Sequence, residues 1–151
     1  MMTNSEIISK LEKTFPEVTF NEEESKFLII NVSKDQYYDV MKSLRNLGFD
    51  YLFSMTGMDW GKELGVTNHL ENTQENFMVV VKLKLEDRDN PEIPTLENIW
   101  KTAHLHEREI YDLFGINFIG HSVMKRLLLT EDWEGYPMRK DWKDDSKMII
   151  R

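Results

Sequence analysis

The sequence predicts an α+β fold with a mainly antiparallel sheet, flanking helices and an extended C-terminal tail. Two segments repeat apolar residues at helical spacing behind a capping signal, and four more segments have the composition or alternation of strands. The chain has 151 residues, of which 40% are hydrophobic and 30% charged, and this is enough for one core. We therefore expect a single α+β domain over residues 1–130 and a tail over residues 131–151.

Two helices are expected in the first third of the chain. Residues 3–6 (Thr-Asn-Ser-Glu) and residues 33–36 (Ser-Lys-Asp-Gln) are capping boxes, in which side chains satisfy the free amides of a helix start. The apolar stripes that follow are Ile7, Ile8, Leu11 and Phe15, and then Tyr37, Val40, Met41, Leu44 and Leu47. Pro16 is expected to stop the first helix and Gly48 to end the second.

Strands are expected at residues 27–32, 49–55, 66–70 and 77–85. The polar residues 71–76 would join the last two strands as a hairpin, which makes that pair antiparallel. Alternation along the last strand predicts one buried face and one partly wet face. Residues 57–61 and 86–94 are expected to be loops.

A third helix is expected over residues 99–114, closed by Gly115. Successive residues of a helix are rotated by about 100°. The apolar arc then holds Ile99, Ala103, His106, Ile110, Leu113 and Phe114. Arg108, Glu109 and Asp112 fall on the opposite side, which predicts an outer charged face.

Glu107 is the polar residue that intrudes most clearly on this apolar surface. A carboxylate there would be partly desolvated, which is costly unless a cation or hydrogen-bond donors meet it. Arg126 and Arg139 are the cations that we expect to pair with it. The alternative is that Glu107 bends out to solvent at the helix edge.

The histidines do not form a recognisable metal-binding pattern. The zinc-protease motif His-Glu-x-x-His fails because Ile110 stands where the second histidine belongs. On a helix, His104 and His106 point about 200° apart. His69 and His121 lie far away in the sequence without ligand spacing. We therefore expect no metal site.

The sequence also lacks a recognisable catalytic arrangement. Carboxylates are frequent in the last third, at Glu107, Glu109, Asp112, Asp132 and Asp141. Their spacing selects no acid–base pair. There is no Gly-x-Ser-x-Gly elbow and no glycine-rich phosphate loop. Catalysis by this chain alone is not expected.

The C-terminal tail combines acidic, basic and aromatic residues. An acid–tryptophan pair occurs at Trp133 and again at Trp142, and a turn signal lies between them at residues 135–137. Tryptophan and arginine often anchor protein interfaces. Trp133 fits an interface and the domain's own core equally well, whereas Trp142 favours an interface.

Composition and charge exclude several classes of function. The chain has no cysteine, which rules out disulfides and cysteine-ligated clusters within it. No apolar run approaches the length of about 20 residues that a membrane span needs. The first 100 residues carry 10 basic and 18 acidic residues, and the net charge is −8. This acidic excess argues against nucleic-acid binding.

The block from residue 107 to residue 142 resembles the signature of the C-type, 30 kDa subunit of NADH:quinone oxidoreductase (respiratory complex I). The residues of the expected third helix and of the segment after it that carry the resemblance are Glu107, Arg108, Glu109, Asp112, Phe114, Gly115, Phe118, Gly120, His121 and Arg126. Those of the tail are Asp132, Trp133, Gly135, Pro137, Arg139, Lys140, Asp141 and Trp142. Departures from the family pattern include Ser122 and Thr130, where proline is common, and Tyr136, where histidine is frequent.

The resemblance implies a domain of the 30 kDa subunit type that is a non-catalytic structural subunit of the peripheral arm. Its role would be to brace the quinone-reducing module, on the cytoplasmic side of the cell inner membrane and without a membrane span of its own. No cofactor is expected in this chain, since FMN, iron–sulfur clusters and quinone would belong to partner subunits. The partners would be subunits of the B and D type, with the tail residues 132–142 on the D-like subunit.

Two other interpretations stay open from the sequence. The chain could be the equivalent subunit of a related membrane-bound hydrogenase or of a ferredoxin- or quinone-linked oxidoreductase. It could also be a free-standing acidic enzyme or binding module that reuses the same fold.

Overall fold

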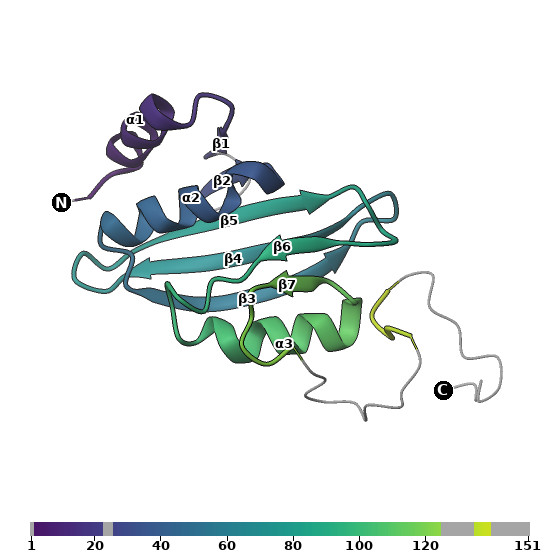
Figure 1. Cartoon of the computed structure of the whole chain (residues 1–151). Helices are drawn as coiled ribbons and strands as arrows, with labels where there is room; N and C mark the ends of the chain where they lie inside the picture. Colours follow the sequence, from purple (N-terminus) through teal and green to yellow (C-terminus); the bar gives the residue numbers. More distant parts are fainter. Residues whose placement is uncertain (1, 23–25, 125–134, 140–151) are drawn as a thin grey trace.

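The computed structural model describes residues 2–22, 26–124 and 135–139, and it has the predicted α+β architecture (Figure 1). In chain order the elements are α1 (Asn4–Thr14), β1 (Thr19–Asn21), β2 (Leu28–Val32), α2 (Lys34–Asn46), β3 (Tyr51–Asp59), β4 (Leu64–Asn72), β5 (Phe77–Leu85), β6 (Glu92–Pro94), α3 (Ala103–Phe114) and β7 (Asn117–Ile119). The longest helix described, α2, has 13 residues. Within the described ranges, no helix has the length and apolarity that crossing a bilayer requires.

The main sheet has five strands in the order β1-β2-β5-β4-β3. Three of its four pairings are antiparallel, and β2 and β5 run parallel. The prediction of a mainly antiparallel sheet is therefore confirmed. β6 and β7 form a separate parallel pair, which joins the segment before α3 to the segment after it.

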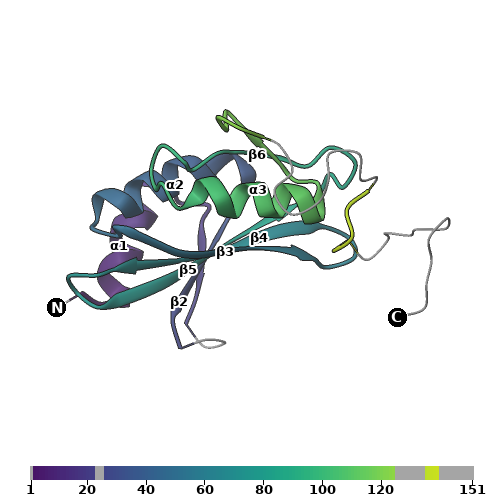
Figure 2. The ribbon, with the colours of Figure 1, turned by 90° about the horizontal axis from the view of Figure 1, so that it is seen from below.

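The three helices pack on one face of the main sheet. Their buried apolar residues belong to a single cluster that includes alternate strand residues such as Leu28, Ile30 and Val81. Figure 2 shows α2 and α3 on the same side of the strands. Ile29 and Val80, which point the other way, are also buried but lie outside this cluster.

The opposite face of the sheet carries no helix within the described residues, and we call it the helix-free face. Neighbouring residues on it include Ser54, Thr67, His69, Val80 and Lys82. The edge strand β3 adds two exposed aromatic side chains nearby. Phe53 is 54% exposed and Tyr51 is 40% exposed, and their rings meet edge to face with centroids 6.1 Å apart.

The capping predictions are only partly correct. Thr3 Oγ1 accepts a hydrogen bond from the Glu6 amide at the start of α1. Ser33 caps no amide of α2, because its hydroxyl instead donates to the Gln36 side chain at 3.2 Å. Gly48 follows the last turn of α2 with a φ of 104°, so the predicted glycine stop is confirmed.

Two predicted boundaries differ most from the observed ones. Residues 57–61 were expected to be a loop, but β3 continues to Asp59 because Gly57 pairs with Val66 and Asp59 with Leu64. The third helix begins at Ala103 rather than at residue 99. Residues 96–100 instead form turns in which the amides of Ile99 and Trp100 donate to the Leu96 carbonyl.

Three short strands were missed in the sequence. β1, β6 and β7 have three residues each, too few for a period-2 pattern to be visible. The β6 strand lies inside the predicted loop of residues 86–94. These strands form because they pair with other segments, so the residues within each strand do not predict it.

Candidate functional site

Glu107 lies at the centre of the candidate site, on α3 and fully buried. Thr95 Oγ1 donates a hydrogen bond to its Oε1 atom, and the Leu96 amide donates to Oε2 at 2.8 Å. Burial is the largest influence on the carboxyl and raises its pKa to about 7, although both hydrogen bonds act to lower it. The expectation that Glu107 enters the apolar surface is confirmed, and the solvent-facing alternative is wrong.

The partners of Glu107 differ from the predicted cations. Arg139 lies at the end of α3, where its Nε donates to the Phe114 carbonyl at 2.6 Å. The proposed pairing with Arg139 is therefore wrong, and Arg126 lies outside the described residues. The carboxylate is met by donors from the turn that precedes α3, because β6 brings this turn against the helix.

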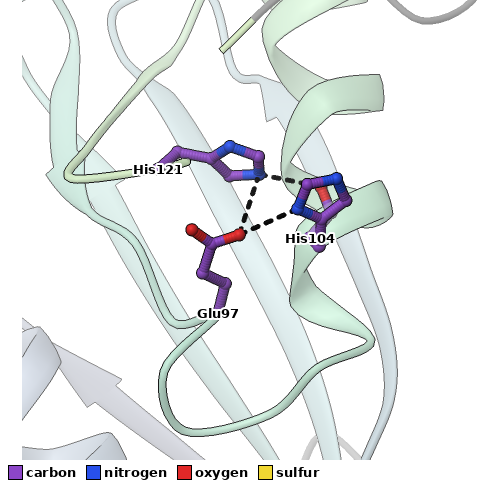
Figure 3. Close-up of side chains that lie close together, drawn as sticks. All are labelled: Glu97, His104 and His121. Carbon is purple, nitrogen blue, oxygen red and sulfur yellow. Dashed lines mark hydrogen bonds and ion pairs between the residues drawn. The ribbon is translucent and has the colours of Figure 1, made fainter. Parts of the chain in front are cut away.

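Beside Glu107, the side chains of Glu97, His104 and His121 form a cluster (Figure 3). They come from three separate segments: the turn after β6, the first turn of α3 and the loop after β7. Glu97 Oε2 lies 2.8 Å from His104 Nδ1 and 3.7 Å from His121 Nε2. The His104 and His121 rings face each other with centroids 4.6 Å apart.

His121 is held through both ring nitrogens. The Val123 amide donates to Nδ1 at 2.9 Å, so the ring hydrogen must sit on Nε2. Nε2 lies 2.9 Å from the His104 carbonyl oxygen, to which it donates. The same nitrogen is 4.0 Å from Glu107 Oε1, and the imidazole is fully buried. The His121 ring therefore lies between the buried carboxylate and the other two side chains of the cluster.

Glu97 ties the turn before α3 to the loop after β7. Its carboxylate accepts hydrogen bonds from the Ser122 amide at 2.6 Å and from the Ser122 hydroxyl at 3.1 Å. Partial burial acts to raise the pKa of Glu97, but the hydrogen bonds from His104 and Ser122 outweigh it and lower the pKa. A proline at position 122 would have no amide hydrogen to donate.

This arrangement was not predicted from the sequence. Helical spacing predicts that His104 and His106 point apart, and it gives no link to His121. The fold nevertheless brings His121 to His104. Thr95 and Glu97 were not singled out at all. No local spacing connects residues 95, 97, 104 and 121, so only the β6–β7 pairing could have indicated that they meet.

Several signature residues have packing roles around α3. Phe114 lies against Gly57 of β3, where an added Cβ would be 2.5 Å from the ring. Phe118 is buried in β7, and Gly120 has a φ of 87° in the turn before His121. Gly115 ends α3 in the left-handed region, as predicted.

The predicted outer charged face of α3 is partly wrong. Glu109 is exposed and Arg108 half-buried, but Asp112 is fully buried. The two-face placement assumed that only the sheet covers this helix. In the structure the turn at Thr95, the loop at His121 and the segment 135–139 also contact it.

Part of the tail packs on the chain's own α3. The Met138 amide donates to the Leu113 carbonyl at 3.0 Å, and the Tyr136 ring lies over Gly115. Together with Arg139 these contacts satisfy carbonyls at the end of the helix, where a cation is also favourable. Of the predicted interface residues, Arg139 contacts α3, and Gly135 and Pro137 lie in the same described segment. The others lie outside the described residues: Asp132, Trp133, Lys140, Asp141 and Trp142.

The arrangement can hold segments together and can offer ligand atoms. Glu107, Glu97 and His121 hydrogen-bond to backbone and hydroxyl groups of neighbouring segments, and Glu97 also contacts His104. A surface groove of about 520 Å³ runs between the start of α2 and the end of β5, and none of the predicted site residues lines it.

Comparison with known sequences identifies similar proteins. A family described as the 30 kDa subunit of respiratory-chain NADH dehydrogenase matches residues 30–147. The C/D subunit of NADH-quinone oxidoreductase from Phocaeicola vulgatus is 46% identical over 124 residues, which are 81% of this chain but 24% of that protein. The C-type subunit of NADH-quinone oxidoreductase from Roseiflexus castenholzii is 33% identical over 147 residues, covering 93% of this chain and 84% of that one. The chain thus spans about a quarter of the C/D relatives.

Two solved structures share the fold. A trypsin-resistant fragment of Nqo5 aligns with a TM-score of 0.72 at 22% identity, over 81% of this chain and 99% of the fragment. A chain of the membrane-bound sulfane sulfur reductase, an archaeal respiratory membrane complex, aligns with a TM-score of 0.80 at 27% identity. That alignment covers 92% of this chain and 85% of the archaeal one.

Proposed function

Because the chain belongs to the family of the 30 kDa subunit of respiratory-chain NADH dehydrogenase, we propose that it is a non-catalytic structural subunit of a proton-translocating NADH:quinone oxidoreductase. It would lie in the peripheral arm and brace the quinone-reducing module. The observation that carries the proposal is the family match over residues 30–147, which spans the Glu107 helix and the tail. Glu107, Glu97 and His121 support it, because their hydrogen bonds fasten segments of the chain to one another.

The proposed partners are subunits of the B and D type. FMN, iron–sulfur clusters and quinone would belong to partner subunits, and the assembly would place this chain on the cytoplasmic side of the inner membrane. The surface supports a role in assembly, since Phe53 and Tyr51 leave an aromatic pair exposed on an edge strand. Aromatic side chains of this kind are frequent at protein interfaces.

A second candidate is the equivalent subunit of a related respiratory complex with another electron donor or acceptor. The alignment with the archaeal sulfane sulfur reductase chain favours it, because both chains are covered over most of their length. The two candidates share the structural role and differ in the reaction of the partner subunits.

The structural role is tested by separating assembly from turnover. We expect Arg139→Ala and Trp133→Ala to lower the amount of assembled complex while the turnover of each assembled complex stays close to wild type. Arg45→Ala, which removes an exposed arginine of α2, is the matched control. Native gels quantify the assembly, and quinone reduction per complex quantifies the turnover. If these variants assemble fully but lose turnover, the residues have a catalytic role instead of a structural one.

A further inference from the structure

Glu97, His104 and His121 bring three potential metal-ligand atoms close together. Each residue offers one ligand atom, and these atoms all lie within 4.8 Å of one another. Glu97 Oε2 approaches His104 Nδ1 and His121 Nε2 most closely. We propose that these three side chains form a binding site for one transition-metal ion of the Zn²⁺ class. The inference is independent of the proposed function, because metal binding is measured on the chain alone.

The spacing of the ligand atoms is close to what such an ion needs. Tetrahedral bonds of about 2.0–2.2 Å place neighbouring ligand atoms about 3.3–3.6 Å apart. The two carboxylate–imidazole distances, 2.8 and 3.7 Å, lie on either side of this range. Shifts of about half an ångström would therefore bring these atoms to the geometry of a bound ion.

The surroundings of the cluster leave room for an open coordination position. The His121 side chain is fully buried, whereas Glu97 is 13% exposed and His104 is 30% exposed. An ion held here would meet protein on one side and water on the other. Three protein ligands and one water is the usual arrangement of an open zinc site.

The ligand types select the class of ion. Two imidazoles and one carboxylate suit Zn²⁺, Co²⁺ and Ni²⁺, whereas Ca²⁺ and Mg²⁺ prefer oxygen ligands alone. Glu97 supplies the negative charge, and its lowered pKa keeps it ionised in the neutral range. The three ligands come from separate segments, so a bound ion would fasten the turn, α3 and the loop after β7 to one another.

Metal binding must compete with the hydrogen bonds of the metal-free chain. His121 Nε2 donates to the His104 carbonyl, and His104 Nδ1 approaches Glu97. Both ring hydrogens must move to the other nitrogen of their ring when the ion binds. The His121 Nδ1 would then become a donor, so the Val123 amide that now faces it must turn away. Val123 lies in an exposed turn, where a water molecule can accept the hydrogen bond of this amide.

This exchange gives the site a spectroscopic signature. In the metal-free chain, the nitrogen resonances of His121 should show the hydrogen on Nε2, and with Zn²⁺ they should show it on Nδ1. His106, which is on the same helix but outside the cluster, should keep its resonances unchanged. A change at His106 alone would contradict the site.

The direct test is titration of the untagged full-length chain, stripped of metal with a chelator, with Co²⁺ and then Zn²⁺. We expect one equivalent of Co²⁺ to give the visible absorption of a tetrahedral centre and Zn²⁺ to displace it. The thermal midpoint should rise with Zn²⁺ because the ion binds only the folded chain. No saturable binding by the wild-type chain would overturn the proposal, whatever the variants do.

Variants assign the binding to the three side chains. His104→Gln and Glu97→Gln should each weaken binding by at least about tenfold, and His106→Gln should leave it unchanged. Circular dichroism checks that each variant is folded. His104 is partly exposed, so its replacement should be the best tolerated. Equal affinity in wild type and His104→Gln would overturn the assignment.

Discussion

The hydroxyl group of Thr95 donates a hydrogen bond to the carboxylate of Glu107, and both residues are buried between the turn after β6 and α3. This contact joins a segment before the helix to the middle of the helix. It also gives the buried carboxylate of Glu107 a hydrogen-bond donor, without which the carboxylate would have too few. The bond therefore contributes directly to the position of α3.

Replacing Thr95 with valine should destabilise the fold. The change keeps the shape of the side chain but removes the hydroxyl, which donates to Glu107 and accepts from the Glu97 amide at 3.1 Å. The Leu96 amide continues to donate to Glu107. We expect a loss of about 1–3 kcal/mol, the cost of leaving a buried polar group short of a partner. Urea unfolding measures it. Thr56→Val on the exposed side of β3 is the matched control and should stay within about 0.5 kcal/mol.

A side chain at Gly57 should not be accommodated beside Phe114. An added Cβ would lie 2.5 Å from the Phe114 ring and 3.2 Å from the Ile110 side chain. Gly57→Ala is expected to cost about 1–3 kcal/mol through overpacking. In a double-mutant cycle, Phe114→Leu should recover part of this loss. Additive losses in the two variants would show that the ring does not restrict position 57.

Tyr37 and Asn68 form a buried contact that should be sensitive to removal of one partner. Asn68 Nδ2 donates to the Tyr37 hydroxyl at 3.1 Å, and both side chains are fully buried. Tyr37→Phe leaves the Asn68 amide without this acceptor and should lower the free energy of unfolding by about 1–3 kcal/mol. Tyr38→Phe, next to it on α2 and only partly buried, is the control. Equal stability of the two variants would show that the Tyr37–Asn68 hydrogen bond does not stabilise the fold.

His69 on the helix-free face should titrate below its ordinary range. Burial is the main cause that lowers its pKa from 6.5, and the charge of Lys82 adds to it. The folded chain thus prefers the neutral imidazole, and stability falls as the pH drops through the unfolded-state pKa. An NMR titration measures the midpoint, and Lys82→Met should raise it only partly because burial remains. A wild-type midpoint at or above 6.5 would contradict this.

Much of the fold follows from local sequence signals. The strand at residues 77–85 has the predicted bounds, and Gly48 and Gly115 end their helices as expected, because alternation and glycine stops act within a few residues. The entry of Glu107 into the apolar surface was also visible from helical spacing. Its donors were not, since Thr95 and Leu96 reach it through the β6–β7 pairing.

The errors at Asp112 and His121 share one physical cause. Asp112 was placed on an outer face because the helix was assumed to be covered on one side only, and it is buried. His121 was judged too distant from His104, and the loop after β7 returns it to the start of α3. In both cases the burial of the residue depends on contacts with segments that are far apart along the chain. The periodicity of apolar residues within one segment does not predict such contacts.

The most direct test of the structural-subunit proposal is the composition of the complex that contains this chain. The tagged chain is purified from its native membrane in mild detergent, and the recovered proteins are identified by mass spectrometry. The proposal predicts recovery with subunits of the B and D type and with iron–sulfur and membrane subunits in fixed ratio. Recovery of the chain alone, or as a symmetric oligomer of itself, would contradict the proposal.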